Sequence, residues 1–281
     1  MAKTATAQPE TRLAECPTPM MAEREPDYAE QLEAIEKIAR LNLPEEDGIP
    51  LESEMHYTLP WMLRLSIQAH WEGRTDFYIG CNMFLYYAYE QAEEIVQAVR
   101  RQRSRRVRFK GPDLFLVRGV EDTTRPRPYW AVWLEQGRYP DLIVEFLSPS
   151  TAQNDKTHKK ELYAKVFHTP EYFWYDPFTG ELAGFRLRMF PDWHYEPMAP
   201  NERGWLWSEV LSAYLGTWTG KVYGREQTWL RLYDAEGNLV LVSEEREATA
   251  RAQAEQARQR AEAAEQRIAE LEAELKRLRG G

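Results

Sequence analysis

Cysteine is scarce in this sequence. Only Cys16 and Cys81 occur among 281 residues, the first in a polar leader and the second in an apolar, strand-like run. Two thiols in such different contexts form neither a disulfide framework nor the ligand spacing of a zinc site. The sequence therefore excludes disulfide-stapled secreted scaffolds and cysteine-ligated zinc domains, and we expect two unpaired thiols.

Long apolar runs are also missing. No run approaches the roughly 20 residues that a membrane-spanning helix requires. The opening stretch MAKTATAQPETRLAECPTPMM lacks the apolar segment of a signal peptide. We therefore expect a protein that stays in the cytoplasm and has no membrane partner.

An overall excess of positive charge is absent as well. The formal net charge is −9 at pH 7, whereas proteins that coat nucleic acid non-specifically carry clustered Lys and Arg. One local exception is the segment RRQRSRRVRFK at residues 100–110. This segment fits either a solvated hairpin tip or the wall of a groove that contacts phosphates. No helix-turn-helix or zinc-finger motif indicates how a nucleic acid sequence would be read.

Aromatic residues are abundant, and their positions indicate where the folded core lies. They make up 12% of the chain and concentrate within residues 57–233, where we expect most of the apolar burial. We predict a disordered leader at residues 1–27, one folded domain at 28–242 and an amphipathic heptad helix at 243–281. Expected helices span residues 28–43, 52–69 and about 155–167, and expected strands span 76–87, a segment from 113, 141–147 and the segment EYFWYDP. This order predicts an α/β fold with a mixed sheet flanked by helices.

Two acidic residues stand in otherwise apolar strands. Asp113 begins one predicted strand, and Glu145 lies near the end of another among Leu, Ile, Val and Phe. An ionised carboxylate is costly to bury without a partner, so both residues need one. If the two strands pair as antiparallel neighbours, Asp113 lies close to Glu145, whereas Asp141 lies roughly 13 Å away along its strand.

The helix that follows carries polar side chains on one face. Asp155, Lys159 and Tyr163 are spaced at i, i+4 and i+8, which stacks them together. An ammonium beside two carboxylates suits phosphodiester hydrolysis, in which the acids hold Mg²⁺ and Lys orients a water or stabilises the developing charge. Structural interpretations stay open: Asp113 fits a turn after proline, Lys159 fits a solvated helix face, and Tyr163 fits core packing.

At these residues the chain resembles the Uma-two family of restriction endonucleases, within the PD-(D/E)XK nuclease superfamily. The resemblance rests on GCNMFLYY, GPDLFLVRGV, PDLIVEFLSPST, DKTHKKELYAKVF and EYFWYDP in this order, and it covers roughly residues 47–235. It implies that Pro112 and Asp113 form the PD motif and that Glu145 is the second acidic residue.

The sequence departs from the superfamily pattern two residues after Glu145, where Leu147 stands in place of Lys. The resemblance implies that Lys159 on the following helix takes the role of that lysine. It also implies a further metal contact from Glu54 on the first core helix, with Glu52 as a rival.

Two functional hypotheses follow. The first is a Mg²⁺- or Mn²⁺-dependent DNA endonuclease in which Asp113, Glu145 and Glu54 hold the metal and Lys159 acts on the attacking water. The alternative is a catalytically inactive nuclease-fold module that binds nucleic acid or protein, which the Leu at position 147 and the negative net charge keep open.

The C-terminal segment has a heptad pattern. Apolar residues alternate in steps of four and three along the segment, which is typical of a coiled coil. They are Ala250, Ala254, Ala257, Ala261, Ala264, Ile268, Leu271, Leu275 and Leu278. We expect residues 244–279 to pair as a homodimer or to bind a partner helix, and a lone solvated helix is the alternative because five of the nine positions are Ala.

Overall fold

A mixed six-stranded sheet organises the part of the chain that the structure describes. The structure is a computed structural model, and it describes residues 54–88, 111–222 and 224–280. All of these residues belong to one compact unit, residues 41–281. The predicted leader at 1–27, the predicted helix at 28–43 and the basic segment at 100–110 lie outside the described residues.

The strand order of the sheet follows from its connections. The strands, in spatial order, are β1 (Phe77–Cys81), β3 (Leu114–Arg118), β5 (Leu142–Phe146), β6 (Glu171–Tyr175), β7 (Leu182–Arg188) and β8 (His194–Pro197). Only β5 and β6 pair in parallel within this sheet; its other neighbours are antiparallel. A parallel pair needs a crossover, which the helical segment after β5 supplies.

Smaller elements complete the architecture. A three-stranded antiparallel sheet runs in the order β11 (Arg225–Tyr233), β10 (Ala213–Val222) and β9 (Leu206–Ser208). A short parallel pair joins β2 (Leu85–Tyr86) to β4 (Trp130–Ala131), and the 3-10 helix η1 (Val132–Leu134) follows β4.

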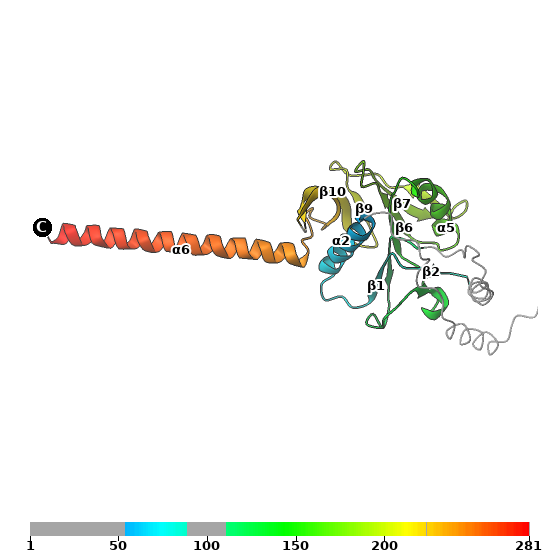
Figure 1. Cartoon of the computed structure of the whole chain (residues 1–281), viewed down its shortest axis with the longest axis horizontal. Coiled ribbons are helices and arrows are strands. Elements are labelled where there is room, and N and C mark those ends of the chain that lie inside the picture. The colour runs from blue at the N-terminus through cyan, green and yellow to red at the C-terminus, as the bar shows by residue number, and fades with distance from the viewer. Residues whose placement is uncertain (1–53, 89–110, 223, 281) are drawn as a thin grey trace, which may run out of the picture. The chain divides into compact units, whose positions relative to one another are not determined.

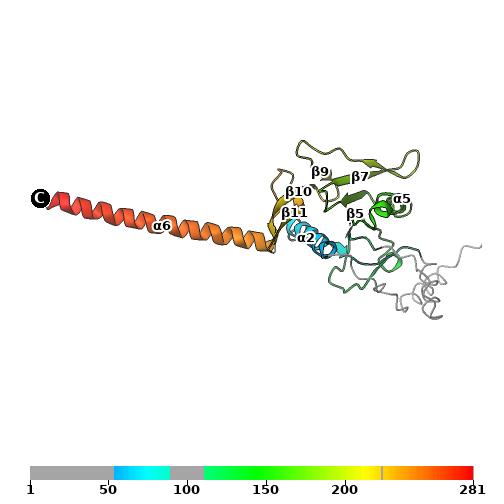
Figure 2. The ribbon, with the colours of Figure 1, turned by 45° about the horizontal axis from the view of Figure 1, so that its top comes forward.

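Both faces of the central strands β3, β5 and β6 are buried. Figures 1 and 2 show α2 (Met55–His70) and α5 (Lys160–Lys165) on opposite sides of the sheet. Alternate residues of β3 and β5 supply the two cores, because successive side chains in a strand point to opposite faces. The first core joins Leu114, Leu116, Val144 and Phe146 to α2, β10 and β11. The second joins Phe115, Val117, Ile143 and Leu147 to Tyr163, Ala164 and Phe167.

The predicted α/β fold, with a mixed sheet, flanking helices and a long C-terminal helix, is confirmed, but two predicted elements are not continuous. The single strand expected at 76–87 is wrong: it is broken into β1 and β2. Asn82 has a left-handed φ of 48°, which an extended strand does not accommodate. Its side-chain amide donates to the carbonyl of His56 at 3.0 Å and fixes the break.

The helix expected at about 155–167 is also composite. It consists of α4 (Ala152–Asn154), the π-helix η2 (Asp155–Lys159) and α5, which ends at Lys165. A π-turn inside a helix is uncommon and is often found at functional sites. Here it holds the two charged residues that the sequence placed on one face, Asp155 and Lys159.

No helix among the described residues is long and apolar enough to cross a membrane.

The C-terminal helix α6 (Ser243–Arg279) is fixed at its first turn by a buried ion pair. The guanidinium of Arg231 on β11 is fully buried and contacts both carboxylate oxygens of Glu245, at 2.8 and 2.6 Å. The same carboxylate accepts the Val242 N–H at 3.0 Å. Because this N–H has no partner within the helix, Glu245 both neutralises a buried charge and caps α6.

Removal of the Glu245 carboxylate is therefore expected to destabilise the fold. Glu245→Ala leaves Arg231 buried without its counter-ion, which should lower the free energy of unfolding by roughly 3–5 kcal/mol. Glu247→Ala is the matched control, since Glu247 and its partner Arg251 are 68% and 83% exposed, and should change stability by less than about 0.5 kcal/mol. Urea denaturation followed by tryptophan fluorescence measures both variants. Equal midpoints would show that the ion pair does not hold α6.

Candidate active site

Asp113 and Glu145 meet where β3 begins and β5 ends. The two strands are antiparallel, with Leu114 opposite Val144, so the residues just beyond this pair are neighbours. The backbone N–H of Asp113 donates to Glu145 Oε2 at 3.2 Å, and the N–H of Phe146 donates to Asp113 Oδ2 at 2.7 Å. Each carboxylate thus accepts a backbone hydrogen bond from the other strand.

The helical segment after β5 adds a lysine and a tyrosine to this pair. Lys159 Nζ lies 3.0 Å from Glu145 Oε1 and 2.8 Å from Asp155 Oδ1. The Tyr163 hydroxyl donates to Glu145 Oε1 at 2.7 Å. The structure therefore brings together Asp113, Glu145 and Lys159, as the strand pairing and helix spacing predicted. We call these three residues, with Asp155 and Tyr163, the acidic cluster.

The acidic cluster is largely inaccessible to water. Glu145 and Asp155 are 0% and 1% exposed, and the Lys159 side chain is 13% exposed. Asp113 is only partly buried. Asp113 and Lys159 are therefore the parts of the acidic cluster that a solvent molecule or ligand can reach.

Burial and crowding of like charges set the protonation of the acids. Loss of solvation raises the pKa of Asp113 to about 6, although the Lys159 ammonium opposes the shift. Loss of solvation also raises the pKa of Glu145 to about 8. The Lys159 ammonium opposes this shift, and the negative charge of the neighbouring Asp113 adds to it. Three carboxyl groups share one ammonium here, so full ionisation would leave an uncompensated negative charge in a buried place.

The pKa of Lys159 is also raised, which keeps this residue charged. Burial lowers its pKa, but the surrounding carboxylates of Glu145, Asp155 and Asp113 outweigh burial and raise it. Lys159 is therefore an ammonium at neutral pH. It can donate hydrogen bonds and stabilise negative charge, but it cannot accept a proton.

The donor set suits a small divalent cation. Two carboxyl groups with raised pKa values would be relieved of mutual repulsion by a cation, and Mg²⁺ is commonly bound through one or two carboxylates with water as the remaining ligands. In addition, Asp155 Oδ1 is buried and accepts no hydrogen bond of acceptable geometry, although Lys159 Nζ is near. Among the described residues no group of three His, Cys, Asp or Glu forms a complete metal site, so waters or substrate oxygens would complete the shell.

Glu54 is not brought to the acidic cluster. It immediately precedes α2, which packs on the face of the sheet opposite to Glu145. Its exposed carboxylate pairs with Arg225 on β11. The rival residue Glu52 lies outside the described residues.

Asp141 is also separate, as its strand position predicted. It lies at the opposite end of β5 from Phe146, accepts the Arg118 N–H at 2.7 Å and pairs with the Arg118 guanidinium at 2.8 Å. These contacts join the far ends of β3 and β5. Asp141 thus has a structural role in strand pairing.

Asp155 and Tyr163 were not included among the predicted site residues. Tyr163 was weighed as a packing residue, and its ring does pack in the core, but its hydroxyl binds Glu145. The spacing of i, i+4 and i+8 with Lys159 was the available signal, since it places all three side chains on one helix face.

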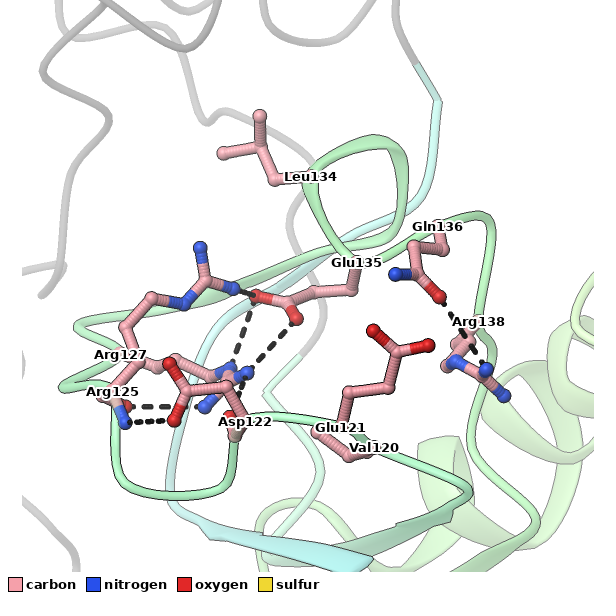
Figure 3. A pocket seen from close by; sticks show the side chains of 9 residues that line it. All are labelled: Val120, Glu121, Asp122, Arg125, Arg127, Leu134, Glu135, Gln136 and Arg138. Atoms are coloured by element: carbon pink, nitrogen blue, oxygen red, sulfur yellow. Dashed lines mark hydrogen bonds and ion pairs between the residues drawn. The ribbon is translucent and has the colours of Figure 1, made fainter. Parts of the chain in front are cut away.

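A separate charged pocket shares no residue with the acidic cluster. Figure 3 shows it, and its lining residues are Val120, Glu121, Asp122, Arg125, Arg127, Leu134, Glu135, Gln136 and Arg138. The buried carboxylate of Glu135 binds both Arg125 and Arg127. Arg127 also lies over the rings of Tyr78 and Trp130. The contacts of Arg127 with Glu135 and with the rings of Tyr78 and Trp130 therefore hold the loop around Arg127 against the strands.

The raised pKa values predict that stability depends on pH when no metal is present. An acid whose pKa is higher in the folded state than in the unfolded state stabilises the fold when the pH is below its pKa in the unfolded state. This contribution is lost as the pH rises through its pKa in the folded state. The contribution of Glu145 is therefore lost between pH 4.5 and about 8, and that of Asp113 between pH 3.8 and about 6. Lys159 stays charged throughout this range. The melting temperature in EDTA should therefore fall between pH 5 and 8.

Glu145→Gln is the informative comparison, because an amide does not titrate. Its melting temperature should change less than that of the wild type between pH 6 and 8. Differential scanning fluorimetry at closely spaced pH values measures both profiles. If the two profiles run parallel above pH 6, Glu145 does not hold the raised pKa.

Comparisons with known proteins agree with the motifs. Residues 88–219 match the model of the Uma2 family, which is described as "Putative restriction endonuclease". The chain is also similar to a solved structure from Anabaena variabilis ATCC 29413, described as "a putative nuclease belonging to DUF820". The identity is 13% and the TM-score 0.40, and the similarity covers 63% of this chain and 89% of that one. No curated protein matches the chain. The range of residues that matches the family model contains the whole acidic cluster.

Proposed function

We propose that this chain is a metal-dependent endonuclease that hydrolyses phosphodiester bonds in DNA. The observation that carries the proposal is the acidic cluster itself: Asp113 and Glu145 converge with Lys159 in a buried place, within the range that matches the family. A protein does not need a lysine and several acids inside an apolar core for stability alone, because apolar residues of similar size often serve as well.

The roles of the residues follow from their contacts. Asp113 and Glu145 would hold Mg²⁺ or Mn²⁺, and the bound ion would lower the pKa of a water and offset charge on the phosphate. The Tyr163 hydroxyl and the Asp113 N–H each hold one oxygen of Glu145 and fix its orientation. The partly exposed Asp113 marks the side from which a phosphate would approach.

Lys159 would act as an electrostatic group. Since its pKa is raised, it stays protonated and cannot serve as the general base. Its ammonium can donate to the attacking water or to a phosphate oxygen that gains charge in the transition state. This role matches the lysine that the family resemblance places on the helix after β5.

A binding module without turnover is the second candidate. It is favoured by one observation, namely that Lys159 is already held by both Glu145 and Asp155. A lysine bound so tightly must break one of these contacts to reach a substrate. Activity measurements distinguish the two candidates.

Plasmid cleavage tests the enzyme proposal. Purified wild-type protein should nick supercoiled plasmid with Mn²⁺ or Mg²⁺ and should not do so with EDTA. Glu145→Ala and Lys159→Ala should each lower the rate by at least about 100-fold, since each removes a group that contacts the reacting atoms. Lys165→Ala, which changes an exposed lysine on the same helical segment, should leave the rate unchanged.

Two results would contradict the proposal. Equal nicking by wild type and Glu145→Ala would reveal a contaminating nuclease. No nicking by wild type with either metal, together with retained DNA binding in a mobility-shift assay, would favour the binding module.

Metal binding makes a separate prediction about stability. Any ligand that binds only the folded state raises its stability by mass action, by about 2.7 kcal/mol at a concentration of 100 Kd. Mn²⁺ should therefore raise the melting temperature of the wild type at pH 7.5 and should raise that of Asp113→Asn much less. Glu121→Gln, which changes a carboxylate in the separate charged pocket, is the control and should respond as the wild type does. Equal shifts in wild type and Asp113→Asn would place the metal elsewhere.

A further inference from the structure

The C-terminal half of α6 presents a continuous apolar stripe to solvent. Ile268, Leu271, Leu275 and Leu278 are 56%, 43%, 52% and 75% exposed. Single exposed apolar residues are ordinary, but four of them at steps of three and four form one line along a helix. No residue along α6, which is described throughout, is buried. The stripe therefore lacks a partner within the described part of this chain.

The heptad positions of the stripe indicate the number of helices that pair. The steps place Ile268 and Leu275 at a positions and Leu271 and Leu278 at d positions. Ile268 is the β-branched a residue which, with Leu at the d positions, favours two parallel strands. Alanines occupy the preceding a and d positions from Ala250 to Ala264, so the larger side chains are confined to the C-terminal end.

The flanking charges specify the orientation of the partner helix. In a parallel pair, each g residue faces the e residue five positions later on the other helix. Between residues 260 and 279 these facing pairs are Arg260 with Glu265, Arg267 with Glu272, and Glu274 with Arg279. All three pairs are of opposite charge, and twofold symmetry repeats each of them.

The antiparallel alternative lacks this complementarity. There, g residues face g residues and e residues face e residues. In the register that sets the stripe against its own copy, with Ile268 opposite Leu278, Glu272 lies against its own copy and Glu274 against its own copy. Like charges that face each other destabilise helix pairing.

Contacts that already exist within one chain do not oppose the parallel arrangement. Arg267 pairs with Glu270 on the same helix, and both side chains are 66% exposed; such a pair is worth little and rearranges readily. The earlier g residue Arg246 would face Arg251, but it is already bound to Glu72 of its own core at 2.7 Å. The repulsive position is thus partly neutralised, and it lies outside the apolar stripe.

We propose that α6 binds α6 of a second copy of this chain as a parallel, in-register, two-stranded coiled coil, through residues 260–279. Because Arg231 and Glu245 hold the start of each helix to its own core, the two cores would lie at the same end of the pair. The proposal does not depend on nuclease activity. If the chain is a nuclease, however, two acidic clusters at one end would suit cleavage of both strands of a duplex.

Sedimentation and cysteine cross-linking test the state and the orientation. In a background with Cys16→Ser and Cys81→Ser, the full chain should sediment as a dimer at tens of micromolar. Mild oxidation of Leu278→Cys should give a covalent dimer on a non-reducing gel, because the two copies of position 278 face each other in a parallel pair. Ala273→Cys, on the outer face of the helix, is the matched control and should stay unlinked.

Charge inversion tests the proposed pairs. Arg260→Glu with Arg267→Glu should raise the dimer dissociation constant roughly tenfold or more, since attractive pairs become repulsive. Glu265→Arg with Glu272→Arg should do the same. Mixing the two variants should restore the dimer, because all three facing pairs between residues 260 and 279 are then of opposite charge. Arg and Glu have similar helix propensities, so circular dichroism should report unchanged helicity.

Three results would overturn the proposal. These are a monomer at tens of micromolar, a species larger than a dimer, and cross-linking that occurs only when Leu278→Cys is mixed with Ile268→Cys. The last result would establish antiparallel pairing.

Discussion

The burial of the Glu145 carboxylate is the constraint on which the centre of this structure depends. A carboxyl group at 0% exposure must be neutralised or hydrogen-bonded. The chain meets this requirement from three directions: the Asp113 N–H from the neighbouring strand, the Lys159 ammonium from the π-helix, and the Tyr163 hydroxyl from α5. The register of β3, the crossover and the packing of α5 are therefore all coupled to one side chain.

The strand that carries Glu145, β5, separates the two cores of the fold. Val144 and Phe146 pack toward α2 and the small antiparallel sheet, while Ile143 and Glu145 point toward α5. The polar group thus sits on the face that the crossover covers. A site built on a central strand and a crossover helix is held by packing on both sides, so its geometry is preorganised rather than assembled by a ligand.

The sequence was informative where local rules decide the outcome, and less so where packing decides it. The approach of Asp113 to Glu145 followed from antiparallel pairing, and the approach of Lys159 to Asp155 followed from helical spacing. Glu54 could not be placed in this way, because its position depends on which face of the sheet α2 covers. The break at Asn82 and the π-turn at Asp155 depend on tertiary contacts that overrule the preference for a regular element. The ring of Tyr163 packs in the core while its hydroxyl binds Glu145. Apolar periodicity in the sequence indicates only the packing of the ring.

The most direct measurement of the central claim is a crystal structure of the full chain soaked in Mn²⁺, with anomalous data collected for the metal. The account predicts an anomalous peak about 2.0 to 2.4 Å from carboxylate oxygens of both Asp113 and Glu145, with Lys159 still within hydrogen-bond distance of the acidic cluster. A fully occupied manganese site elsewhere, with Glu145 still bound only to Lys159, Tyr163 and the Asp113 N–H, would contradict it.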